Sequence, residues 1–468
     1  MIERINSIPD FTSAFHDKRI DKRATEFIHK FVMARKSTIS KIATNFSQQK
    51  AYYRLLENTK FSEDVLIERT VLQCNQNSKG RHVLALNDTV DFNLDAHTGR
   101  LDLVHGFGLS SNTTLGFKLH SSLIVDAQSL FPLGFSSMDC WARPLDHPLK
   151  KDRNYKSSPL EEKESYKWIK AMDATLKNIS NAARITFVAD READIYDVLA
   201  KERNAHTYLI IRSKADRKLS SKLKLRTYLS TRAAQFEYEL QLEGDVRKKS
   251  KSRIANLHVK YEHVTLAKPY SCKNKKLPDS IPINVIEVSE ETSSKTKIHW
   301  LLYTSHEITT PVEVLQVIQW YQARWNIEQV HRLLKTEGLE IEKTQLEKAD
   351  AIKKLLVLAL SATLRVLQLH KVYSEEVEEP IEIGFDTTEQ AFLQQLNTKL
   401  EGTTEKLKNP FNPKELKWAT WIIARLGDWK GYKTQRPPGV ITLQKGLVKF
   451  YHMLEGWAIA QEILVGKR

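Results

Sequence analysis

Three carboxylates stand where they could act together. Asp88 and Asp190 each close a short apolar run, at residues 83–86 and 185–189, and each run has the composition of a buried strand. The third, Glu328, lies in a segment that we expect to be helical. Carboxylate oxygens are the ligands that Mg²⁺ prefers, so these residues predict a site for two divalent cations. A single aspartate at a strand end would more simply cap the following turn.

The segment around Glu328 would place several functional groups on one side of a helix. These residues are Tyr321, Arg324, Glu328 and Lys335. At about 100° per residue they fall within an arc of about 60°. A row of exposed ion pairs would explain such a face without any function. Because Trp320 and Trp325 interleave with the charges, we favour a face that grips phosphates around a metal site.

The chain between residues 81 and 212 predicts the sheet that would position these groups. We expect strands at 83–86, 117–125, 130–137, 185–189 and 208–212. The first three would form an antiparallel meander. A helix should open with a capping box at 158–161 and end near Lys177, and a shorter helix should span 193–201. This order is that of a ribonuclease-H-like α/β fold, in which the ends of the core strands meet at one edge.

Further segments extend this core. Residues from about 214 to 297 alternate apolar and polar side chains and are rich in lysine and arginine, which indicates a β-rich insertion. A second capping box at 310–313 opens the helix of Glu328. Later helices are expected at 348–373, 415–427 and 441–464. Residues 36–43 could be the turn and second helix of a DNA-binding unit, although an ordinary helical bundle fits equally well.

These elements predict three domains. We expect a helical DNA-end-binding domain at 1–70, a ribonuclease-H-like catalytic domain at 71–372 with the β-rich insertion, and a helical C-terminal domain at 373–468. The last helix carries apolar residues at heptad-like spacing, and they are Leu443, Leu447, Phe450, Leu454 and Trp457. This stripe would serve either dimerisation or packing against the 348–373 helix.

Composition narrows the class of protein. The 468 residues include 72 Lys and Arg against 57 Asp and Glu, a net charge of +15, which predicts a polyanionic partner such as nucleic acid. The three cysteines lie far apart without a C-x-x-C motif, so we expect neither a disulfide framework nor a thiolate zinc site. No signal-peptide core or run of 18 apolar residues is visible. We therefore expect a cytoplasmic protein that is not membrane-bound.

The spacing Tyr321-x₂-Arg324-x₃-Glu328-x₆-Lys335 resembles the Y-R-E-K signature of the DDE transposases of the insertion-sequence-four family. Residues 190–195 are similar to the block around that family's second aspartate, and residues 87–89 to the block around its first. The resemblance extends from about Ser47 onward. It places Trp300 where the family has a tryptophan that stacks on a flipped base, with Trp325 as a second candidate, and the Arg212 segment is also similar.

The resemblance implies cut-and-paste DNA transposition. Asp88, Asp190 and Glu328 would bind two Mg²⁺ ions, with Mn²⁺ as a substitute. A nick would leave a 3′-OH that forms a hairpin on the opposite strand; after the hairpin opens, the 3′-OH would join target DNA. The residues expected to contact DNA are Tyr321, Arg324, Lys335, Trp300, Trp325 and Arg212. The partners would be duplex DNA at terminal inverted repeats, target DNA and a second copy of the chain, in a bacterial cytoplasm near the nucleoid.

Two other functions remain open from the sequence. A catalytically silent DNA-binding inhibitor would keep the basic surface, but it would be expected to lack a carboxylate or the N-terminal segment. A structure-specific nuclease would keep the carboxylates but would need neither paired ends nor strand transfer. For Trp300, the simpler explanation from residue type alone is a core tryptophan in a buried strand.

Overall fold

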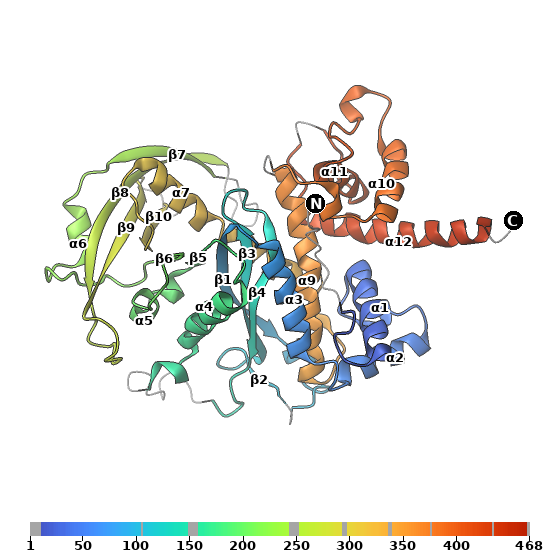
Figure 1. Ribbon diagram of the computed structural model, residues 1–468, viewed down its shortest axis with the longest axis horizontal. Coiled ribbons are helices and arrows are strands. Elements are labelled where there is room, and N and C mark those ends of the chain that lie inside the picture. The colour runs from blue at the N-terminus through green and yellow to red at the C-terminus, as the bar shows by residue number, and fades with distance from the viewer. Residues whose placement is uncertain are drawn as a thin grey trace.

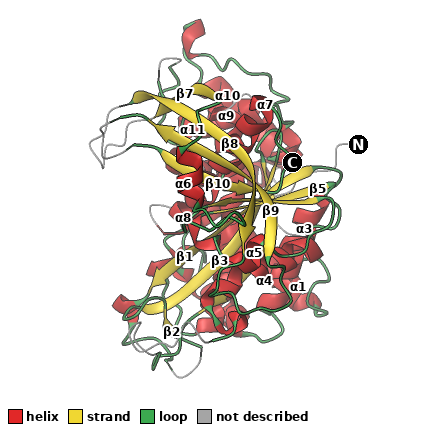
Figure 2. Ribbon diagram, turned by 90° about the vertical axis from the view of Figure 1, so that its left-hand side faces the viewer, coloured by secondary structure: helices red, strands yellow, loops and turns green. Residues whose placement is uncertain are grey.

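The protein is a mixed α/β structure built on one large sheet. The computed structural model describes residues 11–103, 106–147, 158–242, 252–292, 297–335, 339–374, 377–432 and 435–465. Within these residues the sheet has ten strands in the order β2-β3-β1-β5-β6-β10-β9-β8-β7, with β4 paired to β3. Figures 1 and 2 show the strands as a curved surface with helices packed along it.

The strands of the first half are close to those predicted. They are β1 (His82–Asn93), β2 (Gly108–Leu109), β3 (Leu115–Asp126), β4 (Pro132–Trp141), β5 (Arg184–Ala189) and β6 (Thr207–Arg212). β1, β3 and β4 pair antiparallel, which confirms the predicted meander. β5 pairs parallel with β1 and with β6. β1 is three times as long as predicted, because it continues past Leu86 and pairs with β3 as far as Asn93.

The β-rich segment after β6 extends the same sheet. Its strands are β7 (Phe236–Leu242), β8 (Arg253–Ala267) and β9 (Ser280–Glu290), which pair antiparallel in sequence order. β10 (His299–Thr304) then returns between β9 and β6 and pairs antiparallel with both. The insertion is therefore joined to the core by continuous backbone hydrogen bonds. In β7, half-buried and exposed positions alternate, as the sequence indicated.

Helices flank the sheet on the side of the meander and continue beyond it. They are α1 (Lys18–Ala34), α2 (Phe46–Glu57), α3 (Glu63–Asn77), α4 (Lys167–Asn178), α5 (Tyr196–Leu199), α6 (Leu225–Ser230), α7 (Pro311–Gln322), α8 (Trp325–Lys335), α9 (Ala349–Ser374), α10 (Thr387–Leu400), α11 (Leu416–Leu426) and α12 (Val440–Val465). The three long C-terminal helices are confirmed, and α10 was not predicted. The capping box at Thr310 is formed, with Pro311 as the first helical residue.

Two predicted helix starts are wrong. The second N-terminal helix is α2 rather than residues 36–43, which contain only the short 3₁₀ turn Ile39–Lys41. Asn45 sets the start of α2, because its side chain accepts a hydrogen bond from the Gln48 amide at 2.8 Å. The helix expected from 158 begins only at Lys167, since extended Lys163 separates two short 3₁₀ turns before it. The helix expected at 193–201 is the single turn α5.

Helix α9 joins the three parts of the chain that we predicted as domains. It packs against β4, α2, α3, α8, α11 and α12, and Figure 1 shows it running between the sheet and the N- and C-terminal helices. The predicted boundaries at residues 70 and 372 lie inside α3 and α9, respectively. By length and composition α9 could cross a membrane, but 94% of its apolar stretch is buried inside the protein, as is typical of a core helix.

The stripe on the last helix is divided between packing and exposure. Leu443, Leu447 and Phe450 are fully buried, and α12 packs there against α9 and α11. The other two stripe residues, Leu454 and Trp457, are half-buried, and the ring of Trp457 lies 5.4 Å from that of Phe392 on α10. Beyond the stripe, Ile459 and Ile463 are 53% and 55% exposed, where Figure 1 shows α12 extending away from the other helices. The first half of the stripe is therefore intramolecular core.

A histidine cluster ties together the ends of three strands and helix α7. The Thr186 hydroxyl on β5 lies 2.8 Å from His82 Nε2 and 2.9 Å from His306 Nε2. Trp320 of α7 contacts both imidazole rings. Burial lowers the pKa of His82 to about 4, helped by Arg184 and opposed by Asp126. Burial, His82 and Arg184 lower the pKa of His306 to about 3. Both imidazoles are thus held neutral.

We predict that this cluster makes the fold sensitive to mild acid. Both pKa values in the folded protein lie below the pKa of an unfolded histidine, which is about 6.5. As the pH falls, the unfolded chain therefore binds protons before the folded protein does. The free energy of unfolding should decrease as the pH drops from about 6.5 towards about 4. The thermal midpoint of the protein should fall more steeply between about pH 7 and pH 5 than that of a His82→Asn/His306→Asn variant. The exposed control His206→Asn should follow the wild type; equal slopes for all three proteins would contradict the prediction.

Candidate active site

The sheet brings Asp88 and Asp190 to one level. β1 pairs with β5 as far as Leu86 opposite Val188, so each aspartate lies two residues beyond the last parallel pair. Asp190 directly follows β5 and caps a short turn, because its side chain accepts a hydrogen bond from the Glu192 amide at 2.8 Å. Asp88 is not at a strand end as predicted but within β1, which continues along β3 alone. The missing neighbour beyond residue 86 leaves room beside Asp88.

The expected single helix around Glu328 is two helices. α7 ends at Gln322 and α8 begins at Trp325. At the turn, Arg324 N donates to Tyr321 O and Ile327 N donates to Arg324 O, so the hydrogen bonds close three residues back instead of four. Tyr321 lies on the buried side of α7 with Val314, Val317 and Ile318, and it is 6% exposed. Arg324 and Glu328 stay within reach of each other.

Arg324 bridges two of the three carboxylates. Its Nη1 lies 3.2 Å from Asp88 Oδ2 and its Nη2 lies 2.6 Å from Glu328 Oε1. All three side chains are less than one-third exposed, so water screens these charges only in part. Burial raises the pKa of Asp88 to about 6; Asp190 and Glu328 add to the increase, whereas the Thr89 amide and Arg324 oppose it. Asp190 and Glu328 are therefore near enough to Asp88 to disfavour its ionised form.

The donor chemistry of this site fits a divalent cation. Asp88, Asp190 and Glu328 offer the hard oxygen ligands that Mg²⁺ and Mn²⁺ prefer. Across the described residues, no three Asp, Glu, His or Cys side chains lie close enough together to hold a metal ion. Arg324 lies between Asp88 and Glu328 and supplies the positive charge that a cation would bring. The types and charges of these side chains therefore fit a divalent cation. To admit one, the Arg324 guanidinium would have to leave its position between Asp88 and Glu328.

A second group of predicted residues lies at the same sheet edge. Arg212 is opposite Leu302 on β10, one residue beyond the pairing of β6 with the end of β5. Its Nη2 donates to the His299 carbonyl at 3.1 Å. Next along β10, Trp300 is half-buried and meets Tyr321 edge-on, with 5.9 Å between the ring centres. Arg212, Trp300 and Tyr321 thus form one patch beside the carboxylates.

The two remaining predicted residues lie apart from this patch. Lys335 pairs with Glu342 at 3.2 Å and approaches the Phe92 ring near the end of β1. Trp325 is 61% exposed and borders a cavity of about 530 Å³ that Arg332 and Lys371 also line. Lys335 therefore extends the basic face along β1, whereas Trp325 faces another surface of α8.

Two histidines near the carboxylates were not predicted as part of the site. His331 lies one turn after Glu328, and its Nε2 is buried with no hydrogen-bond partner among the described residues. Burial lowers its pKa to about 4, aided by Lys335 and Arg324. His120 is held neutral in the same way and contacts the Thr89 hydroxyl at 2.9 Å. The sequence could have indicated His331, because it lies on the same helix face as Glu328. The sequence could not have indicated His120, because only the register of β3 with β1 places it next to Thr89.

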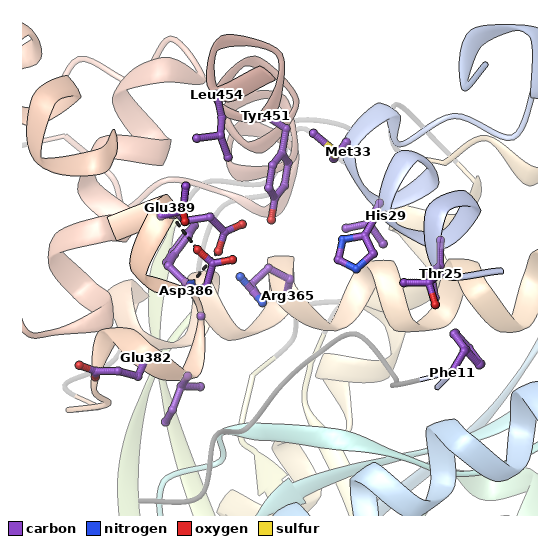
Figure 3. A pocket seen from close by; sticks show the side chains of 16 residues that line it. Phe11, Thr25, His29, Met33, Arg365, Glu382, Asp386, Glu389, Tyr451 and Leu454 are labelled. Carbon is purple, nitrogen blue, oxygen red and sulfur yellow. Dashed lines mark hydrogen bonds between the residues drawn. The ribbon is translucent and has the colours of Figure 1, made fainter. Parts of the chain in front are cut away.

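A cavity of about 620 Å³ between helices is not the candidate active site. It lies where α1, α9, α10 and α12 meet, and Figure 3 shows His29, Arg365 and Tyr451 around it. Asp386 and Glu389 on its wall form the capping box of α10. None of the predicted site residues lines it. The candidate active site is instead an open edge of the sheet, as a long polymeric substrate would require.

Comparison with known proteins agrees with this chemistry. Residues 168–365 match the family model described as a transposase DDE domain, which includes Asp190, Glu328 and the patch around Trp300. The match supports a DDE transposase, a protein of DNA transposition. Asp88 lies before the matched residues.

One solved structure is similar over much of the chain. It is a chain of the piggyBac transposase synaptic complex with hairpin DNA, with a TM-score of 0.36 and 8% identity, covering 75% of this chain and 66% of that one. The protein thus spans just under two thirds of that chain.

We predict that Asp88→Asn stabilises the protein at neutral pH. In the folded protein the pKa of Asp88 is about 6, above the ordinary aspartate value of 3.8. The folded state is therefore favoured while Asp88 is protonated, and this contribution to the free energy of unfolding is lost as the pH rises through about 6. Removing the charge should recover up to about 3 kcal/mol in the absence of metal. Thermal unfolding at neutral pH measures this. Asp91→Asn on the same strand, which loses a surface pair with Lys118, should not gain stability; a gain shared by both variants would contradict the assignment.

Proposed function

We propose that the protein is a cut-and-paste DNA transposase of the insertion-sequence-four family. The observation that carries this proposal is the Arg324 bridge between Asp88 and Glu328, at the sheet edge where β5 delivers Asp190. The Y-R-E-K residues supply that bridge. The motifs also resemble those of the transposase of the kanamycin-resistance composite transposon.

The order of the strands supports a ribonuclease-H-like core. Read from one side, the first half of the sheet is β4-β3-β1-β5-β6, with an antiparallel meander followed by two parallel strands. Parallel strands direct their carboxyl ends to one edge, and ligands of such sheets bind there. The proposed helical N-terminal part would bind transposon ends, and the C-terminal part would hold a second copy of the chain.

The proposed reaction is a series of displacements at phosphorus. Water attacks a phosphodiester at the transposon end and releases a 3′-OH. This hydroxyl attacks the opposite strand and forms a hairpin; water opens the hairpin, and the 3′-OH then attacks target DNA. Each step exchanges one P–O bond for another, so no oxidant or energy source is needed.

The residues of the site have separate tasks in this scheme. Asp88, Asp190 and Glu328 would hold two divalent cations, Mg²⁺ or Mn²⁺, which when bound supply activation of the attacking oxygen and charge neutralisation at the leaving oxygen. Arg324 would exchange its two carboxylate partners for a phosphate of the cleaved strand. Arg212 and Lys335, at the two sides of the site, would bind flanking phosphates.

A paired complex would require a second copy of the chain. The exposed apolar end of α12, with Met453, Ile459 and Ile463, is the surface that we propose for dimerisation on DNA. Its buried first half is excluded from that role because it packs against α9 and α11. A cytoplasmic site of action follows from this function and remains part of the proposal.

We predict that Asp88→Ala, Asp190→Ala and Glu328→Ala each abolish cleavage and leave binding to the DNA ends largely intact. Losing one oxygen ligand removes the cation site, whereas DNA binding depends mainly on cationic residues elsewhere. The substrate is a duplex carrying the inverted repeats that the proposal expects beside the gene, and nicking with Mg²⁺ is followed beside a gel-shift.

The controls for this experiment separate the alternatives. Asp91→Ala should cut normally. A wild-type protein that binds the repeats without nicking them would favour the inhibitor, and one that cuts branched DNA without repeats would favour a structure-specific nuclease. Full cleavage by any one of the three variants would remove that residue from the site.

We predict that Trp300→Ala blocks hairpin formation after a normal first nick. The nick requires a positioned phosphate, whereas the hairpin requires an extruded base, and stacking on an aromatic ring repays about 1–3 kcal/mol of unstacking. Trp300 is half-buried at the edge of Tyr321, so one side of the indole can face DNA. A time course of nick, hairpin and double-strand break, with thermal unfolding beside it, measures this.

Trp320→Ala is the matched control for Trp300. Its indole donates to the Ala127 carbonyl and packs in the histidine cluster, so its loss should reduce stability and slow every step together. The same behaviour in Trp300→Ala would identify Trp300 as a core residue and defeat the stacking role.

A further inference from the structure

The loop between β8 and β9 carries an unusually exposed aromatic ring. Tyr270 is 92% exposed, more than any other large apolar or aromatic side chain among the described residues. Lys273 lies over its ring, with Nζ 3.7 Å from the ring centre. The neighbouring Lys275 and Lys276 are also exposed. Figure 1 shows this loop at the far end of β8 and β9 from the helical C-terminal part.

Hydrogen bonds within the loop and to the core hold it in place. Lys268 N donates to Asp279 O at 2.8 Å across its base, and Lys268 Nζ donates to Leu277 O at 2.8 Å. The Tyr196 hydroxyl of α5 donates to Pro278 O at 2.8 Å. The exposure of Tyr270 is therefore a property of an anchored loop.

The charges of the loop are nearly all of one sign. Residues 268–279 contain four lysines and one aspartate, and that aspartate lies 4.0 Å from Lys268. No acidic partner is recorded for Lys273, Lys275 or Lys276 among the described residues of the chain. Three ammonium groups and a phenol hydroxyl thus point from one anchored loop into solvent.

We propose that this loop is a DNA-backbone contact outside the carboxylate site, with Tyr270 and its three neighbouring lysines binding duplex phosphates. The inference rests on the proposed function for its ligand. Lysines act on phosphates as point charges, and a tyrosine hydroxyl donates a hydrogen bond to the same oxygens. The loop is anchored to α5, which begins six residues after Asp190. It leads into the start of β9, whereas Val288 near the other end of β9 pairs with Trp300, so the loop would hold a separate stretch of the duplex.

Duplex DNA fits this surface better than other polyanions. The loop has one aromatic ring and no apolar helix face that would enter a membrane, and its ring is already covered on one side by Lys273. The loop's one amide side chain, Asn274, accepts a hydrogen bond from the Lys276 amide at 3.0 Å, which favours a sequence-independent grip by the lysines. Such contacts are charge-driven, so their number appears in the salt dependence of binding.

The test compares two variants that each remove three positive charges. The loop variant is Lys273→Gln/Lys275→Gln/Lys276→Gln. The control is Lys399→Gln/Lys406→Gln/Lys414→Gln, at exposed positions of the C-terminal part. Binding of a linear duplex without terminal repeats is measured against salt concentration, and nicking of DNA that carries the repeats is measured at low salt.

We expect the loop variant to flatten the plot of log affinity against log salt by about 2 to 3, at about 0.9 per lost phosphate contact, while the control changes little. Adding Tyr270→Ala to the loop variant should weaken duplex binding further. Adding Tyr432→Ala, which removes another exposed tyrosine, should not. Both triple variants should still nick at low salt, since the carboxylates are intact.

The outcomes separate this inference from the proposed function. A wild-type protein that fails to nick but shows the loop-dependent salt slope would overturn the transposase and keep the DNA contact. Normal nicking with equal slopes in both triple variants would overturn the contact alone. A loop variant that binds DNA as the wild type does, but binds anionic lipid vesicles less well, would also overturn the proposed DNA contact. That result would favour a membrane-binding loop.

Discussion

Three carboxylates brought to one edge of a sheet repel one another, and in this protein the guanidinium of Arg324 offsets that repulsion. Parallel pairing of β1 with β5 fixes the level of Asp88 and Asp190, and the turn between α7 and α8 aims Arg324 between Asp88 and Glu328. The raised pKa of Asp88 is the part of the repulsion that remains.

The turn between α7 and α8 separates Tyr321 from Arg324. Tyr321 belongs to the buried side of α7 and packs against Trp300, whereas Arg324 lies in the turn and bridges Asp88 and Glu328. The aromatic contact and the charged bridge are thus close in sequence but have different partners.

Helix α9 explains why the chain does not divide where composition and charge suggested. Its buried face is continuous from the meander to α11 and α12, and Lys354 on it donates to the carbonyls of Leu56 and Asn58 at 3.0 Å each. The sheet likewise continues from β6 through β10 to the inserted strands. The inserted strands and the strand that precedes Asp190 therefore belong to one continuous sheet.

Residue types and spacing were enough to predict the candidate carboxylates, the basic helix face and most strands, because each depends on local periodicity and on the chemistry of a side chain. The mixed α/β class and the antiparallel meander followed from the same patterns. Tertiary structure alone decided that Asp88 lies within a strand, that the helix breaks before Trp325, and that Leu443, Leu447 and Phe450 pack inward. Those outcomes depend on which neighbours compete for a backbone hydrogen bond or an apolar surface, and that competition involves residues hundreds of positions apart.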